Sequence, residues 1–125
     1  MKTKIVTDKA PAAVGPYSQA IDIGNLVFLA GQIYLTPEGV LLEGTKEEQI
    51  RQVMKNLEAV LKAAGMTFAN VVKTTIFITD MSQYPLVNEV YGSYLVEPFP
   101  ARETVGVETL PKGAWLEISM IAARE

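Results

Sequence analysis

The spacing of apolar and polar residues changes several times along this chain, and each change marks an expected element. Residues 45–64 repeat apolar side chains every three or four positions, which is the period of a helix with one buried face. The stripe consists of Ile50, Val53, Met54, Leu57, Val60, Leu61 and Ala64. Thr45 and Glu48 match a capping box at the start, and Gly65 matches a C-terminal cap at the end. The pattern therefore predicts a helix over this range.

Three short segments before this helix have the β-branched and apolar composition of strands. They cover residues 4–6, 17–23 and 26–31. Gly24 and Asn25 form a two-residue link between the second and third segments, which is a strong signal for a β-hairpin. The first part of the chain therefore predicts one strand followed by a hairpin.

Two further elements are expected after the first helix. Residues 71–79 are rich in β-branched side chains and predict a strand. Residues 82–95 predict a second helix, in which Ser82 is the expected cap and Pro85 lies in the tolerant first turn. Asp80, between the two elements, is expected to act as a cap or turn residue.

The segment from Pro98 to Ala122 predicts a closing hairpin, because two strand-like runs flank the turn sequence Leu110-Pro111-Lys112-Gly113. Tight pairing of these runs would put apolar residues on one face, namely Val105, Val107, Leu116, Ile118 and Met120. The other face would carry Arg102, Thr104, Gly106, Trp115, Glu117 and Ser119. We therefore expect the apolar face in the core and any chemistry on the polar face.

The expected order is strand, hairpin, helix, strand, helix and hairpin, within a single domain over residues 1–125. Hairpins require antiparallel neighbours, whereas alternating helices and strands favour a mixed sheet. This combination predicts an α+β fold in which two helices pack on one face of a six-stranded mixed sheet. The uncovered face, with Arg102 and Glu117 on it, is expected to meet solvent or another subunit.

The amino-acid composition excludes or disfavours several classes of function for this fold. With 49% hydrophobic residues the chain is rich for a small monomer, which favours burial of apolar surface between subunits. The net charge of -3 and the scattered Lys and Arg residues argue against nucleic-acid binding. There is no Cys and no His, which excludes disulfides, thiolate nucleophiles, imidazole acid–base steps and Cys/His metal sites.

Localisation and metal content follow from the same inspection. The start of the chain lacks the apolar run of a secretory signal, and no stretch is long enough to cross a membrane. Asp and Glu residues do not cluster with the spacing of metal ligands. We therefore expect a cytoplasmic protein without a metal site.

Two charged residues of the closing segment are the first candidates for chemistry. Arg102 offers a planar fork of donors suited to a carboxylate or phosphate, although an ion pair with Glu103 or Glu108 would also explain it. Glu117 lies inside an apolar strand, where glutamate is seldom buried without a partner. A structural salt bridge or a solvated strand face is the alternative for Glu117.

Three uncharged residues are weaker candidates. Tyr17 follows Gly15-Pro16 and could point its hydroxyl into a cleft, or could cap the hydrophobic core. Gly31 would let a ligand approach the backbone closely, or could simply end a strand. Asn88 could donate to a ligand from the second helix, or lie on its surface.

Several short sequence blocks can be considered together, namely Gly15-Pro16-Tyr17-Ser18-Gln19-Ala20, Gly24-Asn25, Ala30-Gly31-Gln32-Ile33, Asn56-Leu57, Ala63-Ala64-Gly65, Lys73-Thr74-Thr75-Ile76-Phe77, Pro100-Ala101-Arg102, Leu110-Pro111-Lys112-Gly113 and Glu117-Ile118. Through these blocks the chain resembles the RidA/YjgF family of reactive-intermediate deaminases over almost its whole length. These blocks stand in the order of the family, and the first and the last three are highly specific in combination.

The resemblance implies a chorismate-mutase-like α+β fold and a homotrimer with ligand clefts between subunits. It implies hydrolysis of reactive 2-imino acids, 2-iminobutanoate and 2-iminopropanoate, to 2-keto acids and ammonia, with no cofactor. Small imino and keto acids are the implied partners, without nucleic acid or membrane. The implied site residues are Arg102, Glu117 and Tyr17 as catalytic groups and Gly31, Asn88 and Thr104 as substrate contacts.

Four positions depart from the family pattern. Ala30 stands where serine is frequent, Thr104 where some members have cysteine, and Tyr34 where proline is usual. Ser119 replaces a second glutamate. Ala30 and Tyr34 are expected to reshape the cleft, so the preferred imine is left open, whereas Arg102 and Glu117 are both present.

These residues give a mechanistic hypothesis. Arg102 would bind the substrate carboxylate through two hydrogen bonds, Glu117 would orient or deprotonate water, and Tyr17 would hold the imine nitrogen. The predicted hairpin register puts Arg102 opposite Ile121 and roughly 13 Å from Glu117, which favours a site shared between subunits.

Two other functions remain open at this point. A non-catalytic metabolite-binding trimer would use the same arginine, and a deaminase could act on a related enamine. A ribonuclease is disfavoured because the chain has no histidine and no basic stripe.

Overall fold

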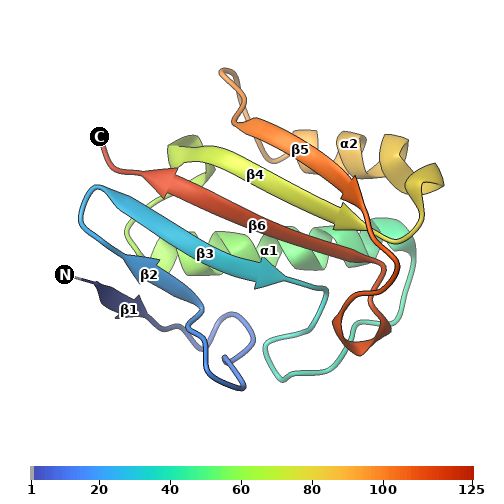
Figure 1. Ribbon diagram of the computed structural model, residues 1–125, viewed down its shortest axis with the longest axis horizontal. Helices are drawn as coiled ribbons and strands as arrows, with labels where there is room; N and C mark the ends of the chain where they lie inside the picture. The colour runs from blue at the N-terminus through green and yellow to red at the C-terminus, as the bar shows by residue number, and fades with distance from the viewer. Residues whose placement is uncertain (1) are drawn as a thin grey trace.

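The computed structural model describes residues 2–125 and shows two helices against one face of a six-stranded sheet (Figure 1). The strands are β1 (Thr3–Ile5), β2 (Ala20–Asp22), β3 (Leu26–Gln32), β4 (Val71–Ile78), β5 (Ala101–Gly106) and β6 (Leu116–Ala123). The helices are α1 (Lys46–Ala63) and α2 (Tyr84–Gly92), and the short 3₁₀ turns are η1 (Phe68–Asn70), η2 (Met81–Gln83) and η3 (Pro111–Gly113). The predicted α+β class, with its mixed six-stranded sheet, is confirmed.

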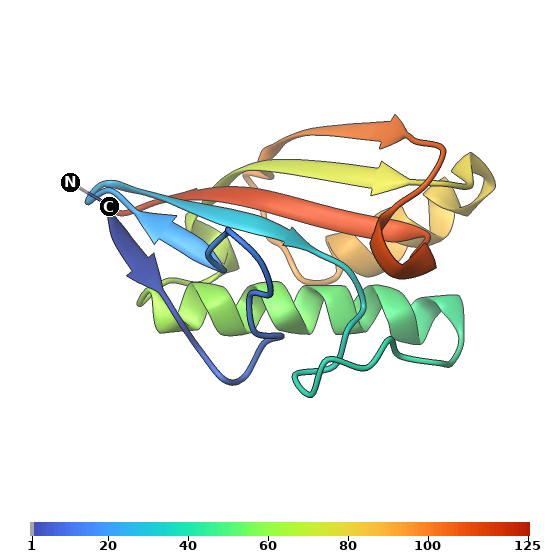
Figure 2. The same cartoon turned by 60° about the horizontal axis from the view of Figure 1, so that its bottom comes forward.

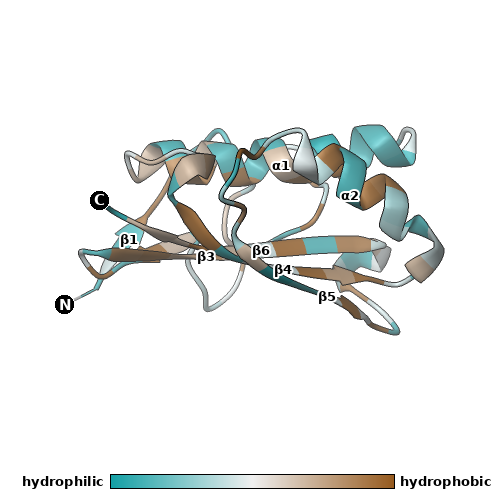
Figure 3. Cartoon of the chain, turned by 90° about the horizontal axis from the view of Figure 1, so that it is seen from above, coloured by the Kyte–Doolittle hydropathy of each residue, from teal (hydrophilic) through white to brown (hydrophobic). Residues whose placement is uncertain are grey.

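Both helices cover the same face of the sheet, as the edge-on views in Figures 2 and 3 show. We call the covered face the helix face and the other the open face. The open face carries large apolar side chains in contact with solvent, and Phe28, Val72 and Val105 are 41%, 47% and 39% exposed. Among the described residues, no helix has both the length and the apolar character needed to cross a membrane.

The long helix α1 forms as its sequence predicts. The Thr45 hydroxyl accepts from the backbone N–H of Glu48 at 3.1 Å, and the Glu48 carboxylate accepts from the Thr45 N–H at 2.8 Å. This reciprocal capping box satisfies two donors that a helix start leaves free. Gly65, with a φ of 75°, follows the helix in the left-handed conformation of a C-terminal cap.

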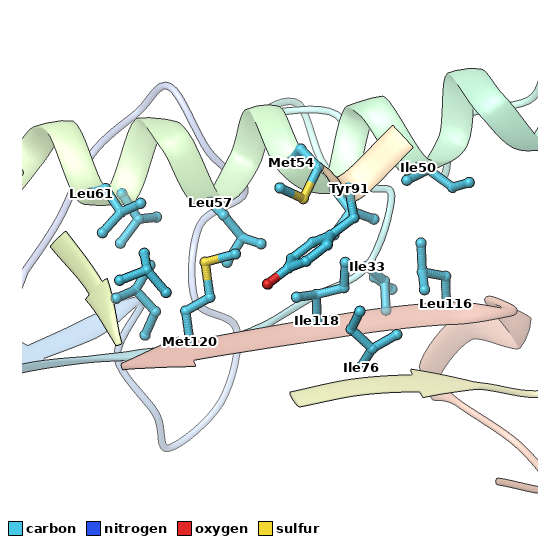
Figure 4. Packing of buried hydrophobic residues seen from close by; sticks show 14 of the residues in the cluster. Ile33, Ile50, Met54, Leu57, Leu61, Ile76, Tyr91, Leu116, Ile118 and Met120 are labelled. Carbon is cyan, nitrogen blue, oxygen red and sulfur yellow. The ribbon is translucent and has the colours of Figure 1, made fainter. Parts of the chain in front are cut away.

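The apolar stripe of α1 packs onto the central strands and forms the core (Figure 4). Ile50, Leu57 and Leu61 are fully buried against strand residues such as Ile118 and Met120. Complete burial of one such side chain contributes roughly 1.5–3 kcal/mol. This packing holds β6 and α1 together and so fixes the strand on which Glu117 lies.

The second helix differs from its prediction at both ends. It starts at Tyr84, where Pro85 occupies the first turn as expected, and it ends at Gly92 rather than at residue 95. Ser82 does not cap it. Instead, Asp80 caps η2 by accepting from the Ser82 N–H at 3.0 Å, which confirms the expected capping role of Asp80.

The predicted closing hairpin is wrong, because β5 and β6 are not neighbours. The strand order is β1-β2-β3-β6-β4-β5, so β4 lies between them, and β5 pairs with β4 in parallel (Figure 1). The expected turn at residues 110–113 forms η3 within a longer connection that crosses the end of β4. The apolar alternation of β6 suits a central strand buried on its helix face, whereas the charged strand β5 suits an edge.

This topology puts Arg102 and Glu117 on opposite faces of the sheet. Arg102 pairs with the buried residue Thr74, so its side chain lies on the helix face. Glu117 pairs with Phe77 on β4 and alternates with the core residue Ile118, so it lies on the open face. The expectation that Arg102 and Glu117 share one face is therefore wrong.

Candidate functional site

The predicted site residues fall into two groups on the two faces of the sheet. Tyr17, Gly31 and Glu117 line one cavity of about 570 Å³, which we call the glutamate pocket. Arg102, Asn88 and Thr104 lie beneath α2, and we call this group, together with Tyr84 and Tyr91, the arginine cluster. Two strand spacings and three residues along the strands separate the backbones of Arg102 and Glu117, about 14 Å.

Glu117 lies in a space that Gly31 leaves free. A Cβ atom on Gly31 would come within 2.1 Å of Glu117 Oε2. A β-bulge creates this arrangement, because β3 advances from Leu29 to Gln32 while β6 advances only from Met120 to Ile118. Gly31 therefore does more than end a strand: its missing side chain provides the position that the carboxylate occupies.

The environment of Glu117 favours its neutral form. The carboxylate is half-buried, and the aromatic ring of Phe77 stands on the neighbouring strand. Within residues 2–125 Glu117 makes no hydrogen bond or ion pair, so the predicted salt-bridge alternative does not hold. Burial raises the pKa of Glu117 above its ordinary value. A carboxylate with a raised pKa and free lone pairs can take a proton from water near neutral pH.

Tyr17 borders the pocket on a loop that a buried glutamine holds. Gln19, only 4% exposed, accepts from the Thr7 N–H at 2.8 Å and donates to the Pro11 carbonyl at 2.8 Å. Residues 17–19 were expected to form a strand, but the side chain of Gln19 ties them to the preceding loop, and β2 begins at Ala20. Tyr17 is 55% exposed, which does not fit an aromatic cap on the core.

Ile33 and Leu35 form another wall of the pocket, and hydrogen bonds from α1 fix their backbone. Asn56 is fully buried and donates to the carbonyls of Ile33 and Leu35 at 3.2 and 2.8 Å. Tyr34, between them, is buried, and its hydroxyl accepts from the Trp115 N–H at 3.0 Å. The expectation that Tyr34 reshapes the cleft is not met at the pocket surface, because Tyr34 does not line it.

Arg102 is held in the arginine cluster by polar and aromatic contacts. Its guanidinium donates to Asn88 Oδ1 at 2.7 Å and to the Tyr84 hydroxyl at 2.9 Å. The Tyr84 and Tyr91 rings lie 5.6 and 5.5 Å from the guanidinium carbon, within cation–π range. These bonds use two of the five N–H donors, and three remain for a ligand.

The alternatives for these residues can now be decided from their contacts. Arg102 does not pair with Glu103, whose carboxylate lies 3.3 Å from Lys73 Nζ. Asn88 contacts Arg102 rather than lying idle on the helix surface. Sequence reasoning missed Tyr84, although its spacing of four from Asn88 predicts that both lie on one face of α2.

Thr104 lies two residues beyond Arg102 on the helix face of β5. Its hydroxyl oxygen is buried and has no hydrogen-bond partner within residues 2–125. Buried polar groups are nearly always satisfied, so the unpaired Thr104 hydroxyl is an exception on the same face of β5 as Arg102. No three His, Cys, Asp or Glu residues in the described part of the chain lie close enough to hold a metal ion.

Known proteins of similar sequence and structure indicate the family of this chain. The sequence profile of a protein family described as endoribonuclease L-PSP matches residues 7–124. The chain is 46% identical over 121 residues to the 2-iminobutanoate/2-iminopropanoate deaminase of Mus musculus, covering 96% of this chain and 90% of the relative. It is 45% identical over 126 residues to a RutC family protein of Pyrococcus horikoshii, covering 100% of both. The crystal structure of RidA from an Antarctic Psychrobacter has 44% identity and a TM-score of 0.93, covering 98% of this chain and 99% of that one.

The raised pKa of Glu117 predicts how its replacement changes stability with pH. The folded state holds the Glu117 proton more tightly than the unfolded state, so the wild type loses stability as pH rises through that window. Glu117→Gln cannot ionise and escapes this loss. The variant should therefore gain stability relative to wild type between about pH 4 and pH 7. Urea unfolding of both proteins at about pH 4 and pH 7, at one protein concentration, measures the difference in their free energies of unfolding. A relative loss at pH 7 would instead reveal a stabilising partner for the carboxylate.

Proposed function

Because this chain belongs to the endoribonuclease L-PSP family, the RidA/YjgF family that its motifs resemble, we propose that it is a hydrolytic deaminase of 2-imino acids. It converts 2-iminobutanoate and 2-iminopropanoate to the 2-keto acids and ammonia, the substrates for which its mouse relative is named. The observation that carries the proposal is Glu117, an unpaired carboxylate with a raised pKa beside Tyr17 in a cavity of small-molecule size.

In the proposed reaction, Arg102 binds the substrate carboxylate and fixes the imine carbon. The three free N–H donors of its guanidinium, which Asn88 and Tyr84 orient, permit a two-point contact. The Thr104 hydroxyl supplies a further polar contact beside it. A guanidinium held in this way loses little freedom on binding, so more of the contact contributes to affinity.

Glu117 carries the proton transfers. It accepts a proton from water as the water oxygen bonds to the imine carbon, and the C=N bond becomes a single bond. The proton then passes from Glu117 to the nitrogen of the tetrahedral intermediate. Ammonia leaves as Glu117 takes the remaining hydroxyl proton, and the carbon–oxygen double bond of the keto acid forms. The Tyr17 hydroxyl holds the nitrogen side of the substrate. Positioned proton transfer of this kind contributes about 100- to 10,000-fold in rate.

We further propose that the site forms between copies of the chain in a homotrimer. One chain presents Arg102 on the helix face and Glu117 on the open face, so it cannot bring both to one small substrate. Heterologous contacts around a threefold axis would let the glutamate pocket of one copy receive the arginine cluster of the next. The exposed apolar side chains of the open face, including Phe28 and Val105, supply surface to bury in such contacts.

The activity is tested by generating 2-iminobutanoate with threonine dehydratase and trapping the remaining imine with semicarbazide. Wild-type protein should lower the amount of trapped imine, and Arg102→Ala should abolish this effect, because the substrate carboxylate loses its two-point contact. The spectrophotometric signal of the semicarbazone provides the measurement. Undiminished trapping in the presence of folded wild-type protein would refute the deaminase proposal.

The shared site is tested by co-expressing Arg102→Ala and Glu117→Ala chains. Each variant alone should be inactive, but random trimers contain intact sites wherever a chain with Arg102 adjoins a chain with Glu117. A cyclic arrangement predicts recovery of about a quarter of wild-type activity in the mixture. If the mixture stays as inactive as either variant, both residues of a site come from the same chain.

The Gly31–Glu117 contact gives a further prediction. Gly31→Ala should displace the Glu117 carboxylate and lower kcat about 100-fold, the lower end of the range for a positioned acid–base group. Its free energy of unfolding should change by less than about 1 kcal/mol, because only the end of a flexible side chain must move. Gly92→Ala is the matched control, since the added Cβ meets nothing within 4 Å beyond its chain neighbours and the backbone of its own helix. Full activity in Gly31→Ala would show that the carboxylate position does not limit the reaction.

A further inference from the structure

Lys112 has an unusual backbone conformation. Its φ of 58° and ψ of 20° lie in the left-handed region, and it is the one non-glycine residue with positive φ within residues 2–125. The next residue, Gly113, adopts a φ of 74° without this steric conflict. Glycine would relax the backbone at position 112 as well, so the lysine side chain is present where the local conformation disfavours it.

Lys112 lines the glutamate pocket, which also contains Glu117. Ion pairs in the described part of the chain join Arg51 to Glu47, Lys73 to Glu103 and Arg124 to Asp22, so neither Lys112 nor Glu117 belongs to one. The Lys112 side chain is exposed, so its ammonium is free to move toward a ligand. Among the described residues, the pocket thus holds one free cation, Lys112, and two free carboxylates, the half-buried Glu117 and the exposed Glu38.

Lys112 and the half-buried Glu117 together match the chemistry of a small zwitterion, whereas Glu38 is exposed to solvent. A protonated 2-imino acid carries a positive C=NH₂ group and a negative carboxylate on adjacent carbons. Glu117 suits the positive end, and an ammonium on the same pocket suits the negative end. The apolar residues Val14, Ile33 and Leu35 offer surface to a short aliphatic side chain between them.

We propose that Lys112 is a further substrate-binding residue whose ammonium contacts the carboxylate of the imino acid held against Glu117. This inference rests on the proposed deaminase function and adds a second cation to it. Arg102 of a neighbouring copy makes its two-point contact with the same carboxylate from the other side, and the Lys112 ammonium binds a remaining lone pair of one carboxylate oxygen. Lys112 then contributes to binding before and during the reaction rather than to proton transfer.

The first test separates this role from a structural one by kinetics. Lys112→Gln should raise KM for 2-iminobutanoate about tenfold with kcat within about twofold, because a contact equal in ground and transition states affects KM alone. Lys112→Arg keeps the charge and should restore KM to within about threefold of wild type. Lys55→Gln, which removes an exposed lysine of α1 outside the pocket, is the matched control and should leave KM unchanged.

Lys112→Gly provides a second test, because a binding role and a structural role predict different changes in KM and thermal stability. It should raise KM as Lys112→Gln does, yet its thermal midpoint should equal or exceed that of wild type, because glycine relaxes the backbone. A lysine with a structural role would give the reverse, unchanged KM and a lower midpoint. Wild-type KM in both Lys112→Gln and Lys112→Gly would overturn the proposal.

The role of Lys112 can also be tested by ligand binding, without measuring turnover. Calorimetry should show that wild type binds 2-oxobutanoate at least about tenfold more tightly than the neutral 2-oxobutanamide, and that Lys112→Gln reduces this preference while Arg102 maintains the remainder. If wild type bound the keto acid in this way but hydrolysed no imine, the deaminase proposal would fail while the role of Lys112 stood. If Lys112→Gln dissociated the assembly and Lys112→Arg restored it, Lys112 would be an interface residue and the inference would be wrong.

Discussion

The position of β6 between β3 and β4 is the constraint on which the rest of the molecule depends. Its helix face packs on α1, and full burial of residues such as Leu116 and Ile118 anchors it there. The same strand has only one other face, and this face must therefore present Glu117 on the side away from the helices. Core packing and the site are thus two consequences of one alternation along β6.

The placement of the arginine follows from the same constraint. Once β6 occupies the centre, β5 can add only at the outer edge of β4, and its parallel pairing turns Arg102 toward α2. There, Asn88 and two tyrosines orient the guanidinium. The fold therefore divides charge between two faces, a cation on one and a carboxylate on the other.

Sequence reasoning succeeded where the signal is local and failed where it is not. The capping box of α1 and the Gly24-Asn25 turn involve neighbours in sequence, so composition alone could reveal them. The partners of β5 and β6 depend instead on β4, which begins about 30 residues before β5, and the alternation within two strands does not show that a third strand lies between them. The residues proposed for the site were identified by motif, but their distribution over two faces required the topology.

The β-bulge in β3 has a consequence for how this chain tolerates changes in length. The bulge adds one residue to the strand, so Leu29 and Gln32 both point into the core although their numbers differ by three rather than two. Deleting Ala30 or Gly31 would restore a regular ladder in which Leu29 and Gln32, then two positions apart, still point inward, but the bulge beside Glu117 would be lost. Insertions and deletions are usually tolerated at loop tips and not in central strands. Here the extra residue in a central strand is itself the feature that makes room for the Glu117 carboxylate, so the length of this short stretch matters as much as its composition.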